Sequence, residues 1–458
     1  MTDATTALEA LRSRLTGRLL LPDDADYDAA RSPWNLAVEQ RPAAVAFPAD
    51  VADVQAIVLA AAEAGLGVTT QPNGHGAAGD LDGVVLVRPT AFDEVSVDVP
   101  ARVLRVGAGV NWGAALQALE GSGLIGLAGS NPEVNVVGLA INGGHSMFSR
   151  LHGLTARSIA ALELVDASGA VRRVTGLDDD DEQGRELIWA LRGGGAAGFG
   201  VITAIELELF PGEALFGGGL VFDAEHAKLV IAAALALGRD VPDLGLDVGM
   251  MQFPDLPVMP PHLRGRTVAT VSLVHVGDEA TGRGYADRVL AVAEPIANAL
   301  TPFTIGELAA VAAEPTDPMP TADFGASLGS DDDAFVAEFV EAFLAGASHG
   351  LTRAGMRPVG GATADALGAD LAAVGAVSAP LVLNTGVLLA GPGVDPEAAL
   401  QPLRDLAARH PGGGGIPSML GPGPLALAYR PEALERLAAV KGSVDPGGLF
   451  RGNRAISG

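Results

Sequence analysis

The stretch Gln71-Pro72-Asn73-Gly74-His75-Gly76-Ala77-Ala78-Gly79 is a glycine-rich loop that carries a single histidine and follows a predicted strand. Glycine lets main-chain N–H groups approach anionic oxygens, because no Cβ stands in the way. The imidazole has no evident packing role in such a loop and can be offered to a ligand ring. The loop therefore predicts a diphosphate cradle with an imidazole beside it, as in a flavin site; an ordinary solvated turn is the alternative.

A strand, a helix and a second strand are predicted just before this loop. Asp50 can cap a helix over residues 51–64, which has one apolar face and stops at Gly65. Residues 43–47 and 67–70 are short apolar runs of the length expected for buried strands. The loop thus begins where a strand ends, which is where α/β folds commonly bind ligands.

Composition restricts the class of protein. A chain of 458 residues that is 48% hydrophobic can bury a substantial core, as two or three folding units or one large enzyme. The net charge of −26 argues against nucleic acid and anionic lipid as partners, since both require clustered Lys and Arg. No apolar run reaches the roughly 18 residues of a membrane span, and the first 20 residues lack a signal-peptide core. We therefore expect a cytoplasmic protein without a membrane partner.

Metal chemistry is not expected either. The chain has no cysteine, which excludes disulfides, thiolate nucleophiles, iron–sulfur clusters and cysteine-ligated zinc. The acidic runs at residues 178–182 and 331–333 could suggest metal sites, but consecutive carboxylates do not point at one centre. We interpret both runs as solvated loops or helix starts.

Two further glycine-rich constellations lie beside predicted strands. One comprises residues 126–130 and 137–145, and the other, residues 192–200, leads into a strand predicted over 201–209. Neither has the P-loop ending Gly-Lys-Ser/Thr, and neither has the tight Gly-x-Gly-x-x-Gly signature of a dinucleotide fold. Together with the histidine loop they indicate one extended anionic ligand, which the backbone approaches at several points.

In this order and spacing the segments resemble a known family of flavoproteins. The chain is similar to the vanillyl-alcohol oxidase/p-cresol methylhydroxylase (PCMH) superfamily, in the branch of berberine bridge enzyme and bacterial 6-hydroxynicotine oxidase. The similarity covers most of residues 40–210 and 430–456. The matching pieces are Asn73-Gly74-His75, residues 138–144, Gly153-Leu154, residues 162–165, 187–195 and 199–203, Asp445-Pro446, Leu449-Phe450-Arg451 and Asn453.

The resemblance implies an α+β fold whose PCMH-type FAD-binding domain is built from both chain ends. The expected boundaries are residues 1–212 for the FAD-binding domain, 213–415 for an inserted substrate-binding domain with an antiparallel sheet covered by helices, and 416–458 for a segment that returns to the first domain. The residues expected at FAD are Asn73, Gly74, His75, Gly76, Ala77, Gly79, Gly129, Ser130, Val137, Gly138, Asn142, Gly143, Gly144, Gly200, Val201, Ile202 and Asn453.

Covalent attachment of FAD is also implied by the resemblance. His75 matches the histidine that the family bonds to the flavin 8α-methyl group, and noncovalent FAD is the alternative. Some relatives have a second attachment through a cysteine, which would fall at Val137, so only single attachment is expected. Gln71 and Pro72 replace an arginine and a serine or threonine of the family loop, which removes one charged contact.

The general base is not evident from the sequence. His145 replaces the third glycine after Asn142 and could contact the substrate, accept a proton or be a packed histidine. Asp247 and Gln252 are further candidates, on opposite faces of a strand predicted over residues 244–253. Residues 416–420 lack the Tyr-x-Asn element of relatives, and we interpret Tyr429 as a packing residue.

We therefore expect an FAD-dependent oxidase that transfers a hydride from a small organic alcohol or amine to flavin N5, with dioxygen as acceptor. One alternative is a dehydrogenase that uses another acceptor. Another is a flavin-containing cyclase, isomerase or binding protein without net oxidation. We expect a small-molecule substrate, no metal and a monomer or homodimer, and the sequence does not identify the substrate.

Overall fold

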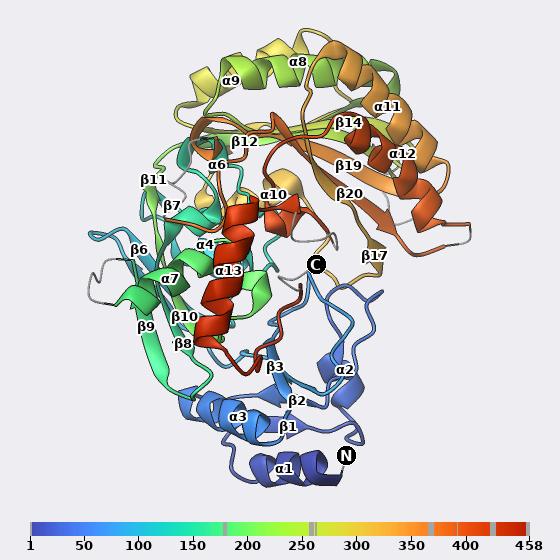
Figure 1. Ribbon diagram of the computed structural model, residues 1–458. Helices are drawn as coiled ribbons and strands as arrows, with labels where there is room; N and C mark the ends of the chain where they lie inside the picture. Colours follow the sequence, from blue (N-terminus) through green and yellow to red (C-terminus); the bar gives the residue numbers. More distant parts are fainter. Residues whose placement is uncertain are drawn as a thin grey trace.

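A computed structural model describes residues 2–176, 181–255, 261, 263–364, 371–391, 393–421 and 427–454. Asp178, Asp179 and Asp180 of the first acidic run lie outside these ranges. The chain is α+β, with three main sheets following one another along the long axis of the molecule (Figure 1). The N-terminus lies at one end of this axis and the helix-covered third sheet at the other.

The first sheet has four strands in the order β1-β2-β4-β3 and carries the histidine loop. Strands β2 and β3 run parallel to β4 on either side of it. Asp50 Oδ1 accepts the Asp53 amide at 2.9 Å and caps α3, whose Val54, Ile57 and Val58 are buried. The predicted strand–helix–strand is thus confirmed, and the loop leaves the end of β3. The elements are α1 (Thr2–Arg12), β1 (Arg18–Leu20), α2 (Tyr27–Arg31), β2 (Ala44–Phe47), α3 (Val51–Glu63), β3 (Gly67–Thr70) and β4 (Val84–Val87).

The second sheet has five antiparallel strands in the order β5-β6-β10-β8-β9. It includes the hairpin β8–β9, whose turn is closed by Asp166 Oδ1 accepting the Ser168 amide at 2.9 Å. The elements are β5 (Val95–Asp98), β6 (Val103–Gly107), α4 (Trp112–Ala118), β7 (Leu124–Ile125), α5 (Val136–Ile141), α6 (Ser149–His152), β8 (Ile159–Val165), β9 (Val171–Thr175), α7 (Glu182–Leu191), β10 (Val201–Glu208) and β11 (Phe210–Pro211).

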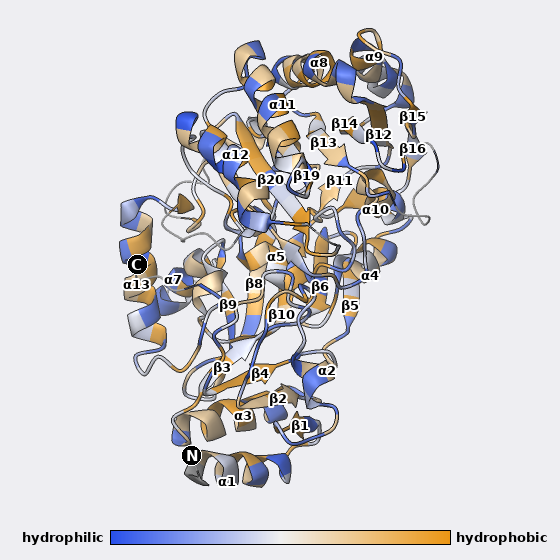
Figure 2. Ribbon diagram, turned by 90° about the vertical axis from the view of Figure 1, so that its right-hand side faces the viewer, coloured by the Kyte–Doolittle hydropathy of each residue, from blue (hydrophilic) through white to orange (hydrophobic). Residues whose placement is uncertain are grey.

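The third sheet is antiparallel, in the order β15-β12-β14-β13-β19-β20-β17, with β16 on β12 and β18 on β20. Four helices, α8, α9, α11 and α12, cover one face (Figure 1). Leu246, Val248 and Met250 of β13 point into this core and are almost fully buried, so Asp247 points to the opposite face. Figure 2 shows the strands largely in hydrophobic colours and the outer helices with hydrophilic segments.

The elements of this region are β12 (Leu215–Asp223), α8 (Ala227–Asp240), β13 (Gly245–Gln252), β14 (Thr267–Val276), α9 (Glu279–Leu290), β15 (Ala297–Asn298), β16 (Thr301–Phe303), α10 (Leu308–Ala312), β17 (Thr321–Ala322), β18 (Gly325–Leu328), α11 (Asp333–Ala347), β19 (Leu351–Pro358), β20 (Leu381–Leu388) and α12 (Pro396–Arg409). Helix α9 ends at Leu290, and short edge strands follow it.

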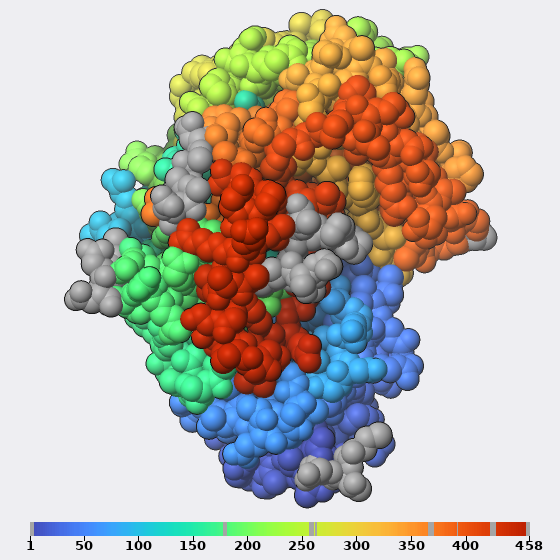
Figure 3. Space-filling model, in the orientation of Figure 1, coloured from blue at the N-terminus to red at the C-terminus, as the bar shows by residue number. Residues whose placement is uncertain are grey.

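The C-terminal residues lie against the first two sheets. Helix α13 (Pro431–Val444) packs on α7, and Figure 3 shows this part of the chain spread over the N-terminal half of one face. Phe450 bridges to Val68 of β3, and Lys441 Nζ donates to Phe450 O at 2.8 Å. Both chain ends thus form one unit, and the third sheet is inserted between them. Within the described ranges no helix is long and apolar enough to cross a membrane.

Candidate functional site

The histidine loop is folded tightly against the segment that precedes β2. Gly74 has a φ of +83°, a left-handed conformation that favours glycine, and a Cβ there would lie 2.7 Å from Pro33 Cβ. The Trp34 amide donates to Asn73 O at 2.7 Å. Glycine at position 74 therefore lets the two segments meet, and a larger residue would separate them.

The imidazole of His75 is positioned by a stacking contact and not by hydrogen bonds to its nitrogens. Its ring stacks on Trp34 with the centroids 4.3 Å apart and an interplanar angle of 15°. Nδ1 and Nε2 are both buried, and neither has a hydrogen-bond partner among the described residues. Burial lowers the pKa of His75 to about 4, against a weak opposing influence of Glu314. Buried polar atoms normally have a partner, so a neutral imidazole with two unpartnered nitrogens indicates a ligand-binding position.

The C-terminal segment joins the histidine loop to the third glycine-rich segment. Asn453 Nδ2 donates to Gly76 O at 2.7 Å. A Cβ at Gly452 would collide with the main chain at Ala196, and the Arg454 amide donates to Ala196 O at 3.3 Å. Two segments more than 100 residues apart in sequence are thereby held by the chain terminus.

The second constellation joins the loop from another side. Asn73 Nδ2 donates to Asn111 Oδ1 at 3.0 Å and also to Glu133 O. Asn135 Oδ1 caps α5 by accepting the Gly138 amide at 2.9 Å. Asn142 O, at the other end of α5, accepts the Ser418 amide at 2.9 Å. The short helix α5 is therefore fixed at both ends.

The expected FAD residues are placed on four segments. The first segment lies between β3 and β4 and contains Asn73, Gly74, His75, Gly76, Ala77 and Gly79. The second surrounds α5, with Gly129 and Ser130 before the helix, Val137 and Gly138 on it, and Asn142, Gly143 and Gly144 after it. The third is Gly200 with the first residues of β10, Val201 and Ile202, and the fourth is Asn453 near the C-terminus. A Cβ at Gly76 would meet nothing closer than Asn453 Nδ2 at 3.6 Å. Open backbone at Gly76 beside the unpartnered imidazole fits a flavin nucleotide.

Gln71 and Pro72, where the loop differs from the family pattern, are held by Gln40 and Arg88. Gln71 exchanges two amide hydrogen bonds with Gln40, at 2.9 and 2.8 Å. Arg88, which follows β4, donates Nη1 to Gln71 O at 3.0 Å and to Pro72 O at 3.2 Å. Burial lowers the pKa of Arg88 to about 10, so the guanidinium stays charged at neutral pH. The buried guanidinium of Arg88 thus contacts the first residues of the loop, although the arginine expected within the loop from the family pattern is absent.

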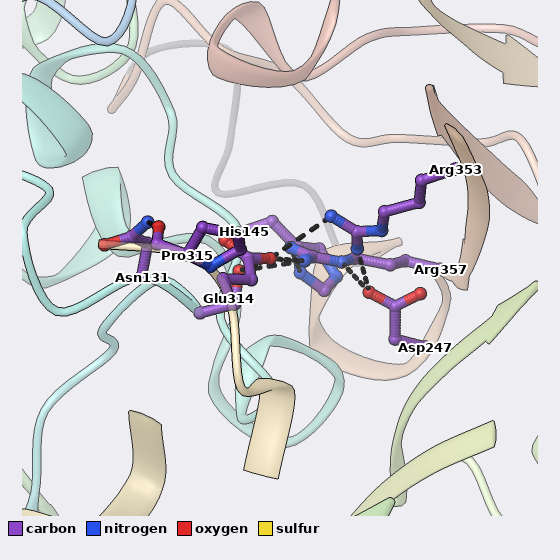
Figure 4. A network of polar contacts seen from close by, with 8 residues as sticks. Asn131, His145, Asp247, Glu314, Pro315, Arg353 and Arg357 are labelled. Carbon is purple, nitrogen blue, oxygen red and sulfur yellow. Dashed lines mark hydrogen bonds and ion pairs between the residues drawn. The ribbon is translucent and has the colours of Figure 1, made fainter. Parts of the chain in front are cut away.

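An ionic network connects the third sheet with the loops before and after α5 (Figure 4). Asp247 Oδ2 of β13 accepts Arg357 Nε at 2.9 Å and Arg353 Nη2 at 3.1 Å, both from β19. Arg353 Nη1 donates to Glu314 Oε1 at 3.2 Å, and Ser130 Oγ donates to the same oxygen at 2.8 Å. The two arginines and two carboxylates balance in charge. Sequence reasoning missed Arg353, Arg357 and Glu314.

The network determines how Asp247 and His145 can act. Burial would raise the pKa of Asp247, but Arg357 and Arg353 outweigh it and lower the pKa, so the carboxylate is a weak base. Arg357 Nη1 lies 3.5 Å from His145 Nδ1, and His145 Nε2 has no partner among the described residues. Burial, reinforced by Arg357, lowers the pKa of His145 to about 3. His145 is therefore a neutral imidazole that accepts at Nδ1 and carries its proton at Nε2.

The structure does not bring the other candidates to this network. Gln252 lies on the helix-covered face of β13, where its Oε1 accepts the Thr267 hydroxyl; the physical reason is the alternation that points Asp247 the other way. Tyr429 donates to Gly193 O, and burial raises its pKa, so it is a packing residue. Within the described residues no cluster of His, Asp and Glu is placed to hold a metal.

Acid is expected to destabilise the protein through His145. Its pKa is about 3 when folded, against an ordinary value of 6.5, so the unfolded chain binds this proton first. Stability should be complete above pH 6.5 and should fall as the pH drops towards about 3. In His145→Asn, whose Oδ1 can still accept from Arg357, thermal unfolding midpoints should fall less over this range. Equal losses in the variant and the parent would contradict the assignment.

The comparisons with known proteins support FAD as the cofactor. Residues 42–175 match the family model described as "FAD binding domain". The chain is 28% identical to (R)-6-hydroxynicotine oxidase of Paenarthrobacter nicotinovorans over 96% of this chain and 97% of that protein. It is 30% identical to xylooligosaccharide oxidase of Thermothelomyces thermophilus, over 41% of this chain and 38% of that protein.

Solved structures share the fold over the whole chain. The structure of 6-hydroxy-D-nicotine oxidase from Arthrobacter nicotinovorans has a TM-score of 0.83 at 22% identity and covers 97% of this chain and 98% of its own. Wild-type BBE-like 1 of Physcomitrella patens has a TM-score of 0.84 at 20% identity, with 98% of both chains covered.

Fold and site together define a flavoprotein enzyme, an FAD-linked oxidoreductase. Residues 42–175 match an FAD binding domain, and the chain is similar over nearly its whole length to 6-hydroxynicotine oxidase and shares its fold with BBE-like proteins, which is consistent with the PCMH-type flavoproteins that the sequence resembles. The α+β fold expected from the sequence is confirmed.

Proposed function

We propose that this chain is an oxidase with FAD covalently attached through His75 alone, which oxidises a C–H bond next to nitrogen or oxygen in a small molecule. The observation that carries the proposal is the imidazole of His75, buried in a glycine-rich loop with both nitrogens unpartnered within the described structure. FAD supplies the hydride acceptor at N5 and returns the electrons to dioxygen. The residues that would hold it are the expected FAD residues on the four segments described above.

The domain division proposed from the sequence suits this chemistry. Residues 1–212 and 416–458 would hold the cofactor, and residues 213–415 would place a substrate against it. The face of the third sheet opposite its helices carries Asp247, Arg353 and Arg357, and of these Arg357 contacts Ser130 and His145 of the first unit. The substrate would bind between the two units, close to this network.

The protonation states of the network favour an amine as substrate. Oxidation of an alcohol requires removal of the hydroxyl proton, whereas a neutral amine can lose a hydride and become an iminium ion without a base. Among the described residues near the network, Asp247 is held ionised by two arginines and His145 has a pKa of about 3, so neither is a strong base at neutral pH. The 28% identity with a hydroxynicotine oxidase over nearly the whole chain supports the same choice.

An anaerobic titration tests this function. A panel of small secondary amines, with alcohols of the same carbon skeleton beside them, is added to the purified yellow protein in the absence of oxygen. We expect an amine to bleach the visible flavin absorbance and admitted air to restore it with formation of peroxide. Bleaching that persists in air would instead indicate a dehydrogenase. Conversion without bleaching would indicate a cyclase or isomerase.

A further inference from the structure

The indole of Trp34 stacks on the imidazole of His75. The indole covers one flat face of the imidazole at 4.3 Å, with the two planes within 15° of each other. It makes this contact without engaging Nδ1 or Nε2, which lie at the ring edge and have no partner among the described residues. A stacking contact of this kind restricts rotation of the imidazole and leaves its nitrogens available.

Trp34 is itself fixed by contacts with both units. Its main-chain N–H donates to Asn73 O at 2.7 Å, inside the histidine loop. Its indole Nε1 donates to Thr316 O at 3.1 Å, and its carbonyl accepts the Met319 amide at 3.2 Å. Residues 316–319 follow Glu314 of the ionic network and belong to the inserted part of the chain. Trp34 is therefore fixed by hydrogen bonds to both the histidine loop and the inserted unit.

Asn35 strengthens this connection at a point that does not touch the imidazole. Its Nδ2 donates to Thr321 O at 3.0 Å, and its Oδ1 accepts the Thr321 amide at 3.0 Å. The two neighbouring residues thus have separable functions. Asn35 attaches the segment to the inserted unit, whereas Trp34 also stacks on His75.

We propose that Trp34 is the positioning residue for covalent flavin attachment, and that it acts by stacking on His75 and aligning an imidazole nitrogen for bond formation. The proposal rests on the proposed covalent bond at His75. Attachment replaces one C–H bond of the 8α-methyl group and one N–H bond of the imidazole by a C–N bond. Dioxygen would take up the two electrons and the two protons that are released and become hydrogen peroxide.

Alignment matters because the attacking nitrogen must be neutral and correctly directed. Burial of the stacked ring lowers the pKa of His75 to about 4, so its lone pair is available at neutral pH. Holding a nucleophile in one orientation removes the entropy cost of finding that orientation during the reaction. An imidazole without the indole beside it would rotate about χ2 and become more hydrated. The stacked tryptophan therefore supplies both conditions.

The test follows covalent attachment in full-length protein purified at successive times after induction. The variants are Trp34→Phe, Trp34→Leu, Asn35→Ala and His75→Ala. Total bound FAD is measured from the visible spectrum, and the covalent fraction from acid-precipitated protein and intact mass. A further variant, Trp34→Met, also lacks an aromatic ring. Methionine fills more of the space of the indole than leucine does, so this variant can be used if Trp34→Leu is insoluble.

We expect Trp34→Phe and Asn35→Ala to attach FAD at close to the parental rate. Trp34→Leu or Trp34→Met should bind FAD and attach it about tenfold more slowly. Parental rates in the ring-free variants would overturn the role of Trp34, and so would an equal loss in Asn35→Ala, which would indicate only general loosening. If the parent protein itself contained only noncovalent FAD, the proposed attachment would fail, which is a different result from failure of the positioning role.

Discussion

His75→Ala is expected to purify with FAD that acid releases completely, whereas the flavin of the parent protein stays with the acid precipitate. The imidazole is the only side chain of the loop with two buried, unpartnered nitrogens in the described structure, and the chain has no cysteine for a second bond. Because the glycine-rich segments and Asn453 are retained, the variant should still bind FAD noncovalently. The measurement is the visible spectrum of pellet and supernatant, together with the intact mass.

His152→Ala is the matched control for this experiment. Its ring stacks on Phe210 with the centroids 4.2 Å apart and has no recorded contact with the histidine loop. The control should retain acid-stable flavin in full. Acid-stable flavin in His75→Ala would assign the bond to another residue, and a colourless parent protein that cannot be reconstituted with FAD would remove the basis of the proposed function.

Arg357→Met is expected to destabilise the protein by about 3 kcal/mol, because it removes one partner of a buried ion pair. The side chains of Arg357 and Asp247 are only 10% and 17% exposed, so water cannot replace the lost contact fully. His145 and Ser130 lose a donor in the same substitution. Oxidation of the amine found in the titration should be impaired as well, since the contacts of Arg357 with Ser130 and His145 across the two units are lost, although the Ser130–Glu314 hydrogen bond of the network remains between them.

Urea unfolding of the purified protein measures the loss of stability. Lys228→Met is the control, because its ion pair with Glu341 is 51% and 71% exposed and should contribute less than about 1 kcal/mol. Asp247→Asn combined with Arg357→Met should recover part of the stability, since the uncompensated carboxylate is then absent. A loss in Arg357→Met no larger than that of the lysine control would show that the network is not a stabilising element.

Local patterns were sufficient for the elements next to the histidine loop. Asp50, the apolar face of α3 and the β3 run predicted a strand–helix–strand that the structure reproduces within one or two residues. The glycine run Gly217-Gly218-Gly219 concealed β12, because consecutive glycines are typical of a loop. A Cβ at Gly217 or Gly218 would collide with a main-chain carbonyl, of Leu273 or Ala299 respectively. Close packing of neighbouring strands therefore requires glycine there, which no local pattern reveals.

The ionic network was even less accessible to sequence reasoning. Arg353 and Arg357 alternate on β19 with Gly355 between them, and nothing local indicates which strand they face. Their partners Asp247 and Ser130 are separated from Arg357 by 110 and 227 residues. The one available signal was the pair of arginines four residues apart on one face of a possible strand, opposite the lone acid of β13.

The sequence by itself determined the cofactor class of this protein and singled out the histidine at which we propose attachment, because a glycine-rich loop after a strand is a local arrangement whose backbone conformation depends on its own residues. Only the tertiary structure decided what surrounds His75 and His145. The stack on Trp34, the contact of Arg88 with the loop and the neutral state of both imidazoles follow from burial and from contacts between distant segments. Register and desolvation belong to the folded chain, and they are absent from any short stretch of residues.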